Sequence, residues 1–240
     1  MLWSVITAIE KQDTAIAKET GRIESFSDGV FAVAITLLVF NLRVPQLAAP
    51  LPGENPTLVL GLALLKQWPS YLTFVTSFAT ILIMWAGHHG TFKLVHKSDT
   101  PFLFANGFLL LLVTVVPFPT SLVAQYLIEP YASMACAAYA GIFFVINIAY
   151  YLLWRSAARD RHLLYPSVSP ELVKVRSRNI LFGLPAYIIA TALAFWSPYV
   201  SVGICSFLWV FWALTFYERK PRRPASEHDG ETTGLHDLVK

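Results

Sequence analysis

The sequence predicts an all-α membrane protein with six transmembrane helices per subunit. Of its 240 residues, 55% are hydrophobic and only 14% are charged, whereas a soluble domain carries roughly 25% charge. The mean hydropathy is +0.54. Aromatic residues make up 14%, which suits the belts at the two membrane interfaces. Long apolar stretches alternate with short segments rich in proline or charge, and each stretch is an expected span.

The first expected span runs over 26–44, which is 19 residues and about 28 Å as a helix, enough to cross the hydrocarbon core. Residues 1–21 are predicted to form a cytoplasmic N-terminal segment. Its apolar start, 1–9, follows no basic residue and is too short for a signal peptide, so we expect a short interfacial or packing helix there. Four prolines mark 43–56 as a loop.

The apolar segment 57–65 is too short to span a membrane, and either lies along the interface or extends the next helix. Pro117 and Pro119 predict a kink near the far end of the third span. Residues 218–240 are polar and charged, which predicts a disordered cytoplasmic tail. The five later spans are expected at 71–88, 100–126, 131–153, 180–198 and 199–217.

The basic residues are distributed unevenly among the expected loops. Sixteen of the 18 Lys and Arg side chains fall on one side of the six-span arrangement, and only Arg43 and Lys66 fall on the other. The positive-inside rule therefore predicts a multi-pass protein of the cell (inner or plasma) membrane with both termini in the cytoplasm. The net charge of +3 is modest, and we expect no nucleic-acid partner.

Val33, Thr36, Leu37 and Phe40 share one face of the first expected helix, because their spacing is i, i+3, i+4, i+7. Two interpretations of this face are open. It packs against a neighbouring helix, with Thr36 bonded back to a carbonyl. Alternatively, it lines a path for ions, with three hydrophobic side chains as a constriction and Thr36 as a layer of hydroxyl groups.

Asp28 is an acid inside its own span, and such groups point to function by default. It either binds or relays a cation or proton, or it is a structural partner of Arg22, Ser27 or a side chain of 85–89 at similar depth. We favour the structural role. His88 and His89 point about 100° apart on a helix and therefore do not chelate a metal as i, i+4 histidines do. We expect no metal site, and we find no residues suited to an enzyme.

Two further asparagines, Asn106 and Asn147, lie at membrane depth and are expected to hold helices together. Cys136 and Cys205 fall in apolar stretches and are expected to be buried small hydrophobes rather than a disulfide.

The start of the first span carries a specific motif, Arg22-x-x-x-Phe26-Ser27-Asp28. It resembles the signature of the endosomal and lysosomal potassium channel family (the transmembrane protein 175 family), in its shorter prokaryotic branch. The resemblance is detailed over 22–120, and beyond that it rests on the helix count. The later residues that carry it are Tyr71, Ser77, Phe78, Trp85, His88, His89, Asn106, Leu109, Leu112, Pro117, Phe118 and Thr120.

The resemblance implies a cation channel of six helices per subunit, in which 22–217 is the channel domain and a homotetramer surrounds a pore lined by the first helix. Val33 would form the narrowest hydrophobic layer, and Thr36 would favour potassium. Leu37 and Phe40 would also face the pore. Val33 is smaller and Phe40 larger than is usual for the family, so Phe40 is an alternative position for the tightest constriction. The resemblance also implies a supporting network of Arg22, Phe26, Ser27, Asp28, Trp85 and His88.

The sequence thus predicts a channel that conducts monovalent cations across a lipid bilayer, modestly selective for potassium over sodium. Potassium is the permeant ion, and no cofactor is expected. One alternative is a proton- or cation-coupled secondary transporter in which Asp28 and His88 titrate. Another is a membrane scaffold that does not conduct.

Overall fold

The computed structural model describes residues 2–49 and 51–217, with side chains at 19–49, 51–159 and 161–214. In these residues the structure consists of helices joined by short connections and contains no strand. An isolated β-bridge joins Val95 to Leu164. The predicted all-helical class is confirmed, while the tail predicted at 218–240 lies outside the described residues.

Three of the helices begin directly after a residue that caps them. Asn55, Asp99 and Ser169 each accept a hydrogen bond from a backbone N–H in the first turn of the helix that follows, as N-cap residues do. The elements in order are α1 (Leu2–Leu37), the 3-10 turn η1 (Leu38–Asn41), α2 (Pro56–Lys66), α3 (Trp68–Phe92), α4 (Thr100–Val115), α5 (Pro117–Tyr126), α6 (Ala132–Ala158), the 3-10 turn η2 (Arg159–Arg161), α7 (Pro170–Leu193) and α8 (Pro198–Tyr217).

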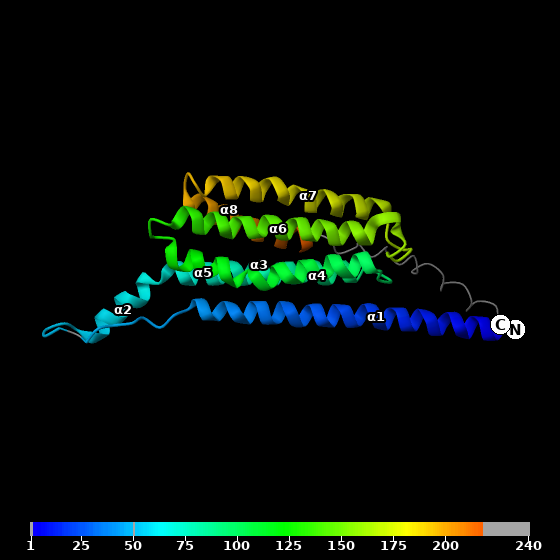
Figure 1. The fold of residues 1–240 in the computed structure, drawn as a ribbon, viewed down its shortest axis with the longest axis horizontal. Helices are drawn as coiled ribbons and strands as arrows, with labels where there is room; N and C mark the ends of the chain where they lie inside the picture. The colour runs from blue at the N-terminus through cyan, green and yellow to red at the C-terminus, as the bar shows by residue number, and fades with distance from the viewer. Residues whose placement is uncertain (1, 50, 218–240) are drawn as a thin grey trace, which may run out of the picture.

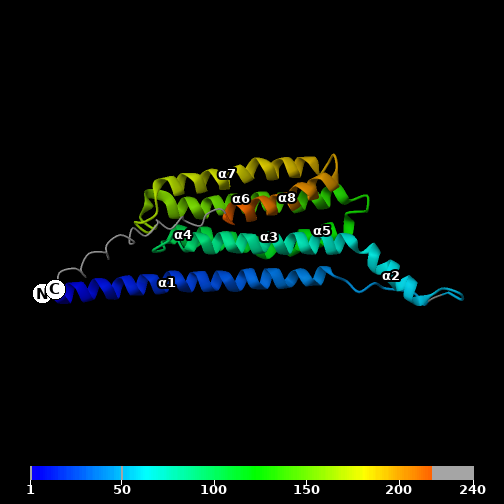
Figure 2. The same ribbon diagram turned by 180° about the vertical axis from the view of Figure 1, so that it is seen from behind.

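The long helices run side by side along the long axis of the molecule (Figures 1 and 2). Helix α6 lies in the middle and contacts α4, α5, α7 and α8. Helix α1 forms one side of the bundle and packs on α3 and α4, and its first half extends past the ends of its neighbours (Figure 1). One side of α1 is therefore covered by the bundle, and its other side is bare.

Four segments are long and apolar enough to cross a membrane: Glu19–Asn41, Trp68–Phe92, Thr100–Tyr126 and Ala132–Ala158. They correspond to the first four expected spans. Helices α7 and α8, of 24 and 20 residues, lie where the fifth and sixth spans were expected. Helix α7 begins ten residues before the predicted 180, because Ser169 caps it and its charged first turns are helical as well.

The structure corrects the expected limits of the first span. Helix α1 begins at Leu2 rather than near 26, and the α-helix ends at Leu37 rather than at 44. The chain tightens into η1 and becomes extended at Leu42, whose N–H donates to the carbonyl of Val39 over 3.0 Å. A closing turn of this kind uses carbonyl groups that the α-helix leaves unpaired at its end.

Helix α2 stands apart from the bundle. It projects beyond the end of α3 at a clear angle (Figures 1 and 2), and it has no buried residue. A break at Gln67 separates it from α3, so 57–65 does not simply extend the next helix. Proline has a similar effect in the third span, which is divided into α4 and α5 at Val116, directly before Pro117.

Candidate functional site on the first helix

The inner face of α1 is built from small and apolar side chains. Ser27, Phe31, Ala34 and Leu38 are buried, and their spacing of four, three and four residues places them on one stripe of the helix. This stripe packs against α3 and α4. It holds α1 in place along its membrane-spanning half.

The outer side of α1 and η1 carries all four residues of the predicted pore face. Val33, Leu37 and Phe40 are 55%, 39% and 74% exposed, and Thr36 is exposed as well. The hydroxyl of Thr36 donates to the carbonyl of Val33 over 2.8 Å, and its oxygen can still accept a hydrogen bond. The chain thus presents an apolar surface with a single hydroxyl group in its middle.

A chain of hydrogen bonds crosses from α1 to α4 and α3 beneath the inner face. The amide nitrogen of Asn106 donates to Ser27 Oγ over 3.0 Å, and Ser27 Oγ donates to the carbonyl of Ile23 over 2.8 Å. The amide oxygen of Asn106 lies 2.8 Å from His88 Nε2. Because this oxygen only accepts, His88 must carry its proton on Nε2. Asn106 therefore joins three helices, as expected for an asparagine at this depth.

Two carboxylates of α1 contact the same part of α3. Trp85 Nε1 donates to Asp28 Oδ1 over 2.8 Å. His89 Nδ1 lies 2.7 Å from Glu24 Oε1, and its ring stacks on Trp85 with centroids 5.8 Å apart. We call the seven residues of these two networks the clamp: Glu24, Ser27, Asp28, Trp85, His88, His89 and Asn106.

The clamp contains four of the six residues expected to support the pore helix: Ser27, Asp28, Trp85 and His88. Arg22 and Phe26 lie instead on the exposed side of α1, and Phe26 is 68% exposed. They point away from the bundle because each lies about 100° around the helix from the inner stripe.

Asp28 and His88 do not bond to each other. Each is held by a different neutral side chain, and of the candidate partners in 85–89 it is Trp85 that reaches Asp28. The pairing of Glu24 with His89 was not predicted from the sequence. Their spacing could have indicated it. Glu24 precedes Asp28 by four residues, and Trp85 precedes His89 by four, so each pair lies on one face of its helix and the two faces can contact each other.

A second set of polar contacts holds the C-terminal end of the first span, at η1, against the bundle. Ser121 on α5 donates its hydroxyl to the side-chain oxygen of Asn41 in η1. Nearby, Ser77 bonds to Thr120 over 2.8 Å and to Tyr139 over 3.0 Å, which links α3, α5 and α6. Helix α1 is thus tied to the bundle at both ends of its apolar stretch.

Metal-ligating side chains do not gather in the part of the chain whose side chains are described, where no group of three His, Cys, Asp or Glu could hold an ion. Cys136 and Cys205 are both buried as free thiols, which confirms that they act as small hydrophobes.

Known proteins of one family are similar to this chain in sequence and in fold. The sequence profile of the family described as endosomal/lysosomal potassium channel TMEM175 matches residues 22–117, which include every clamp and outer-face residue. A potassium channel of Chamaesiphon minutus is 49% identical over 196 residues, covering 82% of this chain and 94% of its own length. A potassium channel of Streptomyces collinus is 40% identical over 178 residues, covering 74% and 83%.

The structural comparison agrees. The crystal structure of a lysosomal potassium-selective channel TMEM175 homolog from Chamaesiphon minutus matches with a TM-score of 0.72 at 48% sequence identity. The match covers 83% of this chain and 98% of that one. Sequence and fold agree along most of both chains, and this protein belongs to the TMEM175 family of membrane ion channels.

Proposed function

We propose that this protein is a homotetrameric cation channel, modestly selective for potassium over sodium, whose pore is lined by the outer face of α1. One observation carries the proposal. The face with Val33, Thr36, Leu37 and Phe40 is exposed in the single chain, while the clamp fixes the opposite face to the bundle.

A single pore helix cannot enclose a path for ions, so conduction requires a ring of identical subunits. In such a ring the outer face of α1 turns toward the central axis. The inner face stays on its own bundle, because its polar groups are already paired there. Each subunit then contributes one helix to the wall and the remaining helices to a rigid support.

The chemistry of the wall accounts for modest selectivity. Four copies of Val33, Leu37 and Phe40 form hydrophobic layers, which can close a pore by excluding water. Phe40 is the bulkiest of the three, and we assign the tightest layer to it. Four Thr36 hydroxyls offer oxygen ligands to an ion that has lost part of its hydration shell, in place of a multi-site carbonyl filter.

We also propose how the chain is arranged in the membrane. Helices α7 and α8 complete six spans, and both chain ends lie in the cytoplasm of a cell with the channel in its plasma membrane. Support comes from the excess of Lys and Arg at one end of the bundle, where the loops 93–99 and 159–169 meet through hydrogen bonds between their backbones. Flow is passive, with K⁺ as the permeant ion.

The test is a bi-ionic recording from purified protein in planar bilayers, with potassium on one side and sodium on the other. We expect step-like currents that reverse toward the potassium potential, and a reversal closer to zero in Thr36→Ala. The matched control is Thr114→Ala, because Thr114 on α4 is also exposed and also bonds back to a carbonyl, that of Leu111, over 2.7 Å. This control keeps the wild-type reversal potential.

Three outcomes contradict the proposal. In the first, folded and oligomeric protein gives no current, and proton-coupled flux in liposomes then becomes the next measurement. In the second, the two threonine variants shift the reversal potential equally. In the third, Thr36→Ala leaves it unchanged.

A further inference from the structure

An open groove lies between the C-terminal end of α6 and the N-terminal half of α7. It has a volume of about 510 Å³, and its walls include Tyr151, Arg155 and Ala158 from α6 and Ser177 and Leu181 from α7. Figures 1 and 2 show α7 along the side of the bundle opposite α1. A ring of subunits around α1, as proposed above, leaves this groove on the side that faces lipid.

The floor of the groove is held by contacts inside the bundle. Trp154 is buried and forms part of this floor, and its Nε1 donates to Ser177 Oγ over 2.9 Å. The guanidinium of Arg176 lies 4.9 Å from the centroid of the Trp154 ring and donates to the carbonyl of Gly87 over 2.9 Å. These contacts join α6, α7 and α3, so the groove is formed before any ligand arrives.

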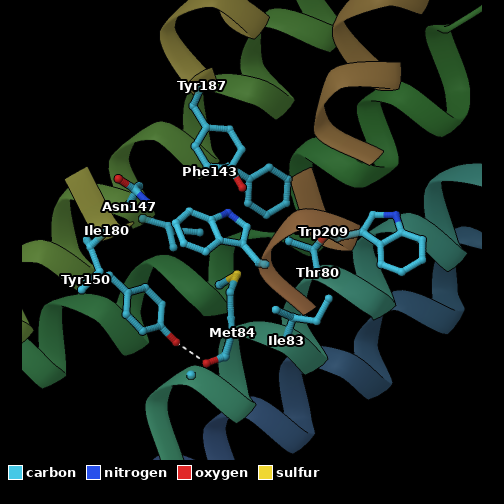
Figure 3. A pocket seen from close by; sticks show the side chains of 12 residues that line it. Thr80, Ile83, Met84, Phe143, Asn147, Tyr150, Ile180, Tyr187 and Trp209 are labelled. Atoms are coloured by element: carbon cyan, nitrogen blue, oxygen red, sulfur yellow. Dashed lines mark hydrogen bonds between the residues drawn. The ribbon is translucent and has the colours of Figure 1, made fainter. Parts of the chain in front are cut away.

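The rotation of α6 turns the neighbouring residues in different directions. Tyr150 points into the bundle, where its hydroxyl donates to the carbonyl of Met84 (Figure 3). The next residue, Tyr151, lies about 100° further around the helix and lines the groove. Arg155 follows Tyr151 by four residues and therefore lies on the same side of α6.

The groove lies where both helices change from apolar to charged sequence. On α6, residues 132–154 contain no Asp, Glu, Lys or Arg, and on α7 residues 179–193 contain none either. Helix α6 has 27 residues, or about 40 Å, which exceeds the hydrocarbon core of roughly 30 Å. Its last turns therefore reach the headgroup layer. The groove spans the boundary between lipid phosphates and acyl chains.

The charge at this end of the two helices is positive. The sequence 151–181 contains six Lys or Arg residues and two Asp or Glu residues. Arg155 and Arg159 both line the groove, and Arg155 is exposed. Its Nη1 lies 3.4 Å from the hydroxyl oxygen of Tyr151, a long contact that leaves most of the guanidinium fork available to an anion.

Helix α7 adds basic side chains to the rim. Lys174, Ser177, Arg178 and Leu181 share one face of α7, because their spacing is i, i+3, i+4, i+7. Lys174 and Arg178 are both exposed. Leu181 is 41% exposed and marks the apolar side of the same groove. A ligand that fits here is anionic at one end and apolar at the other.

We propose that this groove binds an anionic phospholipid. Its phosphate oxygens accept hydrogen bonds from the fork of Arg155 and from the hydroxyl of Tyr151, and an acyl chain lies along Leu181. Free phosphate offers the same oxygens without the chain, so the apolar side of the groove assigns the site to the lipid. In the orientation proposed above the lipid belongs to the cytoplasmic leaflet, where basic pockets between helices bind such headgroups. The site is separate from the pore and does not depend on conduction.

The experiment measures lipid binding to the full chain in detergent by native mass spectrometry. Phosphatidylglycerol is the anionic probe, and phosphatidylcholine with the same acyl chains is the neutral comparison. We expect phosphatidylglycerol to bind at least roughly tenfold more tightly, since each nearby cation contributes about fivefold. Inorganic phosphate is the third probe, and we expect that a millimolar concentration does not displace phosphatidylglycerol.

Two variants change the groove itself. Arg155→Gln removes one cation and should weaken phosphatidylglycerol binding about fivefold. Ala158→Phe keeps the charge but fills the space, and should weaken binding at least as much. The matched control is Lys93→Gln, which removes one exposed cation next to the end of α3, outside the groove, and binds as the wild type does.

Four results overturn the inference. Equal affinity for the two lipids removes the role of charge. Equal weakening in Arg155→Gln and Lys93→Gln shows a diffuse attraction rather than a site. Unchanged binding in Ala158→Phe places the lipid outside the groove. Displacement of phosphatidylglycerol by inorganic phosphate assigns the groove to a free anion instead.

Discussion

The two faces of α1 differ in their contacts although they belong to the same helix. The inner face buries polar groups and pairs them, with Ser27 bonded to Asn106 and Asp28 to Trp85. The outer face is apolar and exposed, with Thr36 as its hydroxyl group. Paired polar groups fix the position of a helix in the bundle, whereas the exposed apolar side chains are not packed against their own subunit. The inner face therefore positions the helix, and the outer face is available for the pore.

The largest expected effect comes from breaking the inner face at Asn106. In Asn106→Ala, His88 Nε2 loses its partner, and Ser27 Oγ loses one donor but keeps its bond to the carbonyl of Ile23. A buried group left unpaired costs about 1–3 kcal/mol. The matched control is Asn147→Ala, which removes the same atoms from a buried asparagine whose oxygen is already unpaired. The free energy of unfolding in detergent should fall clearly more for Asn106→Ala, and equal losses would contradict the assigned role of Asn106.

The next effect comes from the pair of Asp28 and Trp85. A hydrogen bond to a charged group contributes about 1.5–3 kcal/mol, and this one is only partly buried, so we expect Asp28→Ala to lie at the lower end. A double-mutant cycle with Trp85→Phe measures the coupling. The yield of oligomer should fall in each single variant, while channels that do assemble keep their ion selectivity. Altered selectivity in these channels would instead place Asp28 in the ion path.

The sequence predicted this inner face only in part. The spans and the depth of Asp28 follow from hydropathy, and this depth indicates a partner in 85–89. The choice of Trp85 over the histidines depends on the rotation of α3 about its axis, which packing against other helices sets. The pairing of His88 with Asn106 requires α4 to approach, and no local pattern encodes this contact.

The end of the first span shows a second limit of sequence reasoning. Residues 38–44 are mostly apolar, so their pattern continues the helix. In the structure Asn41 is buried and accepts a hydrogen bond from Ser121, a contact 80 residues away in the chain. This tertiary contact and the tight turn of η1 end the helix earlier than hydropathy alone predicts. Phe40 therefore lies on a 3-10 turn.

The smallest effect on stability is expected on the outer face. Thr36 bonds only to its own helix, so Thr36→Ala should change the free energy of unfolding by no more than about 0.5 kcal/mol, as exposed sites usually do. The same variant shifts the reversal potential in the recordings described above. A large loss of stability would show instead that this face packs against protein and that the two faces are not divided as we describe.

The most direct test of the central claim compares two neighbouring positions on α1 during conduction. Silver is a monovalent cation that binds soft thiolate ligands, and the native Cys136 and Cys205 are buried. Leu37 is 39% exposed and Leu38 is 0% exposed. We predict that silver ions block current through Leu37→Cys but not through Leu38→Cys, nor through Val75→Cys on the exposed side of α3. Equal block at Leu37 and Val75, or current through Leu37→Cys that silver leaves unchanged, would contradict a pore lined by the outer face.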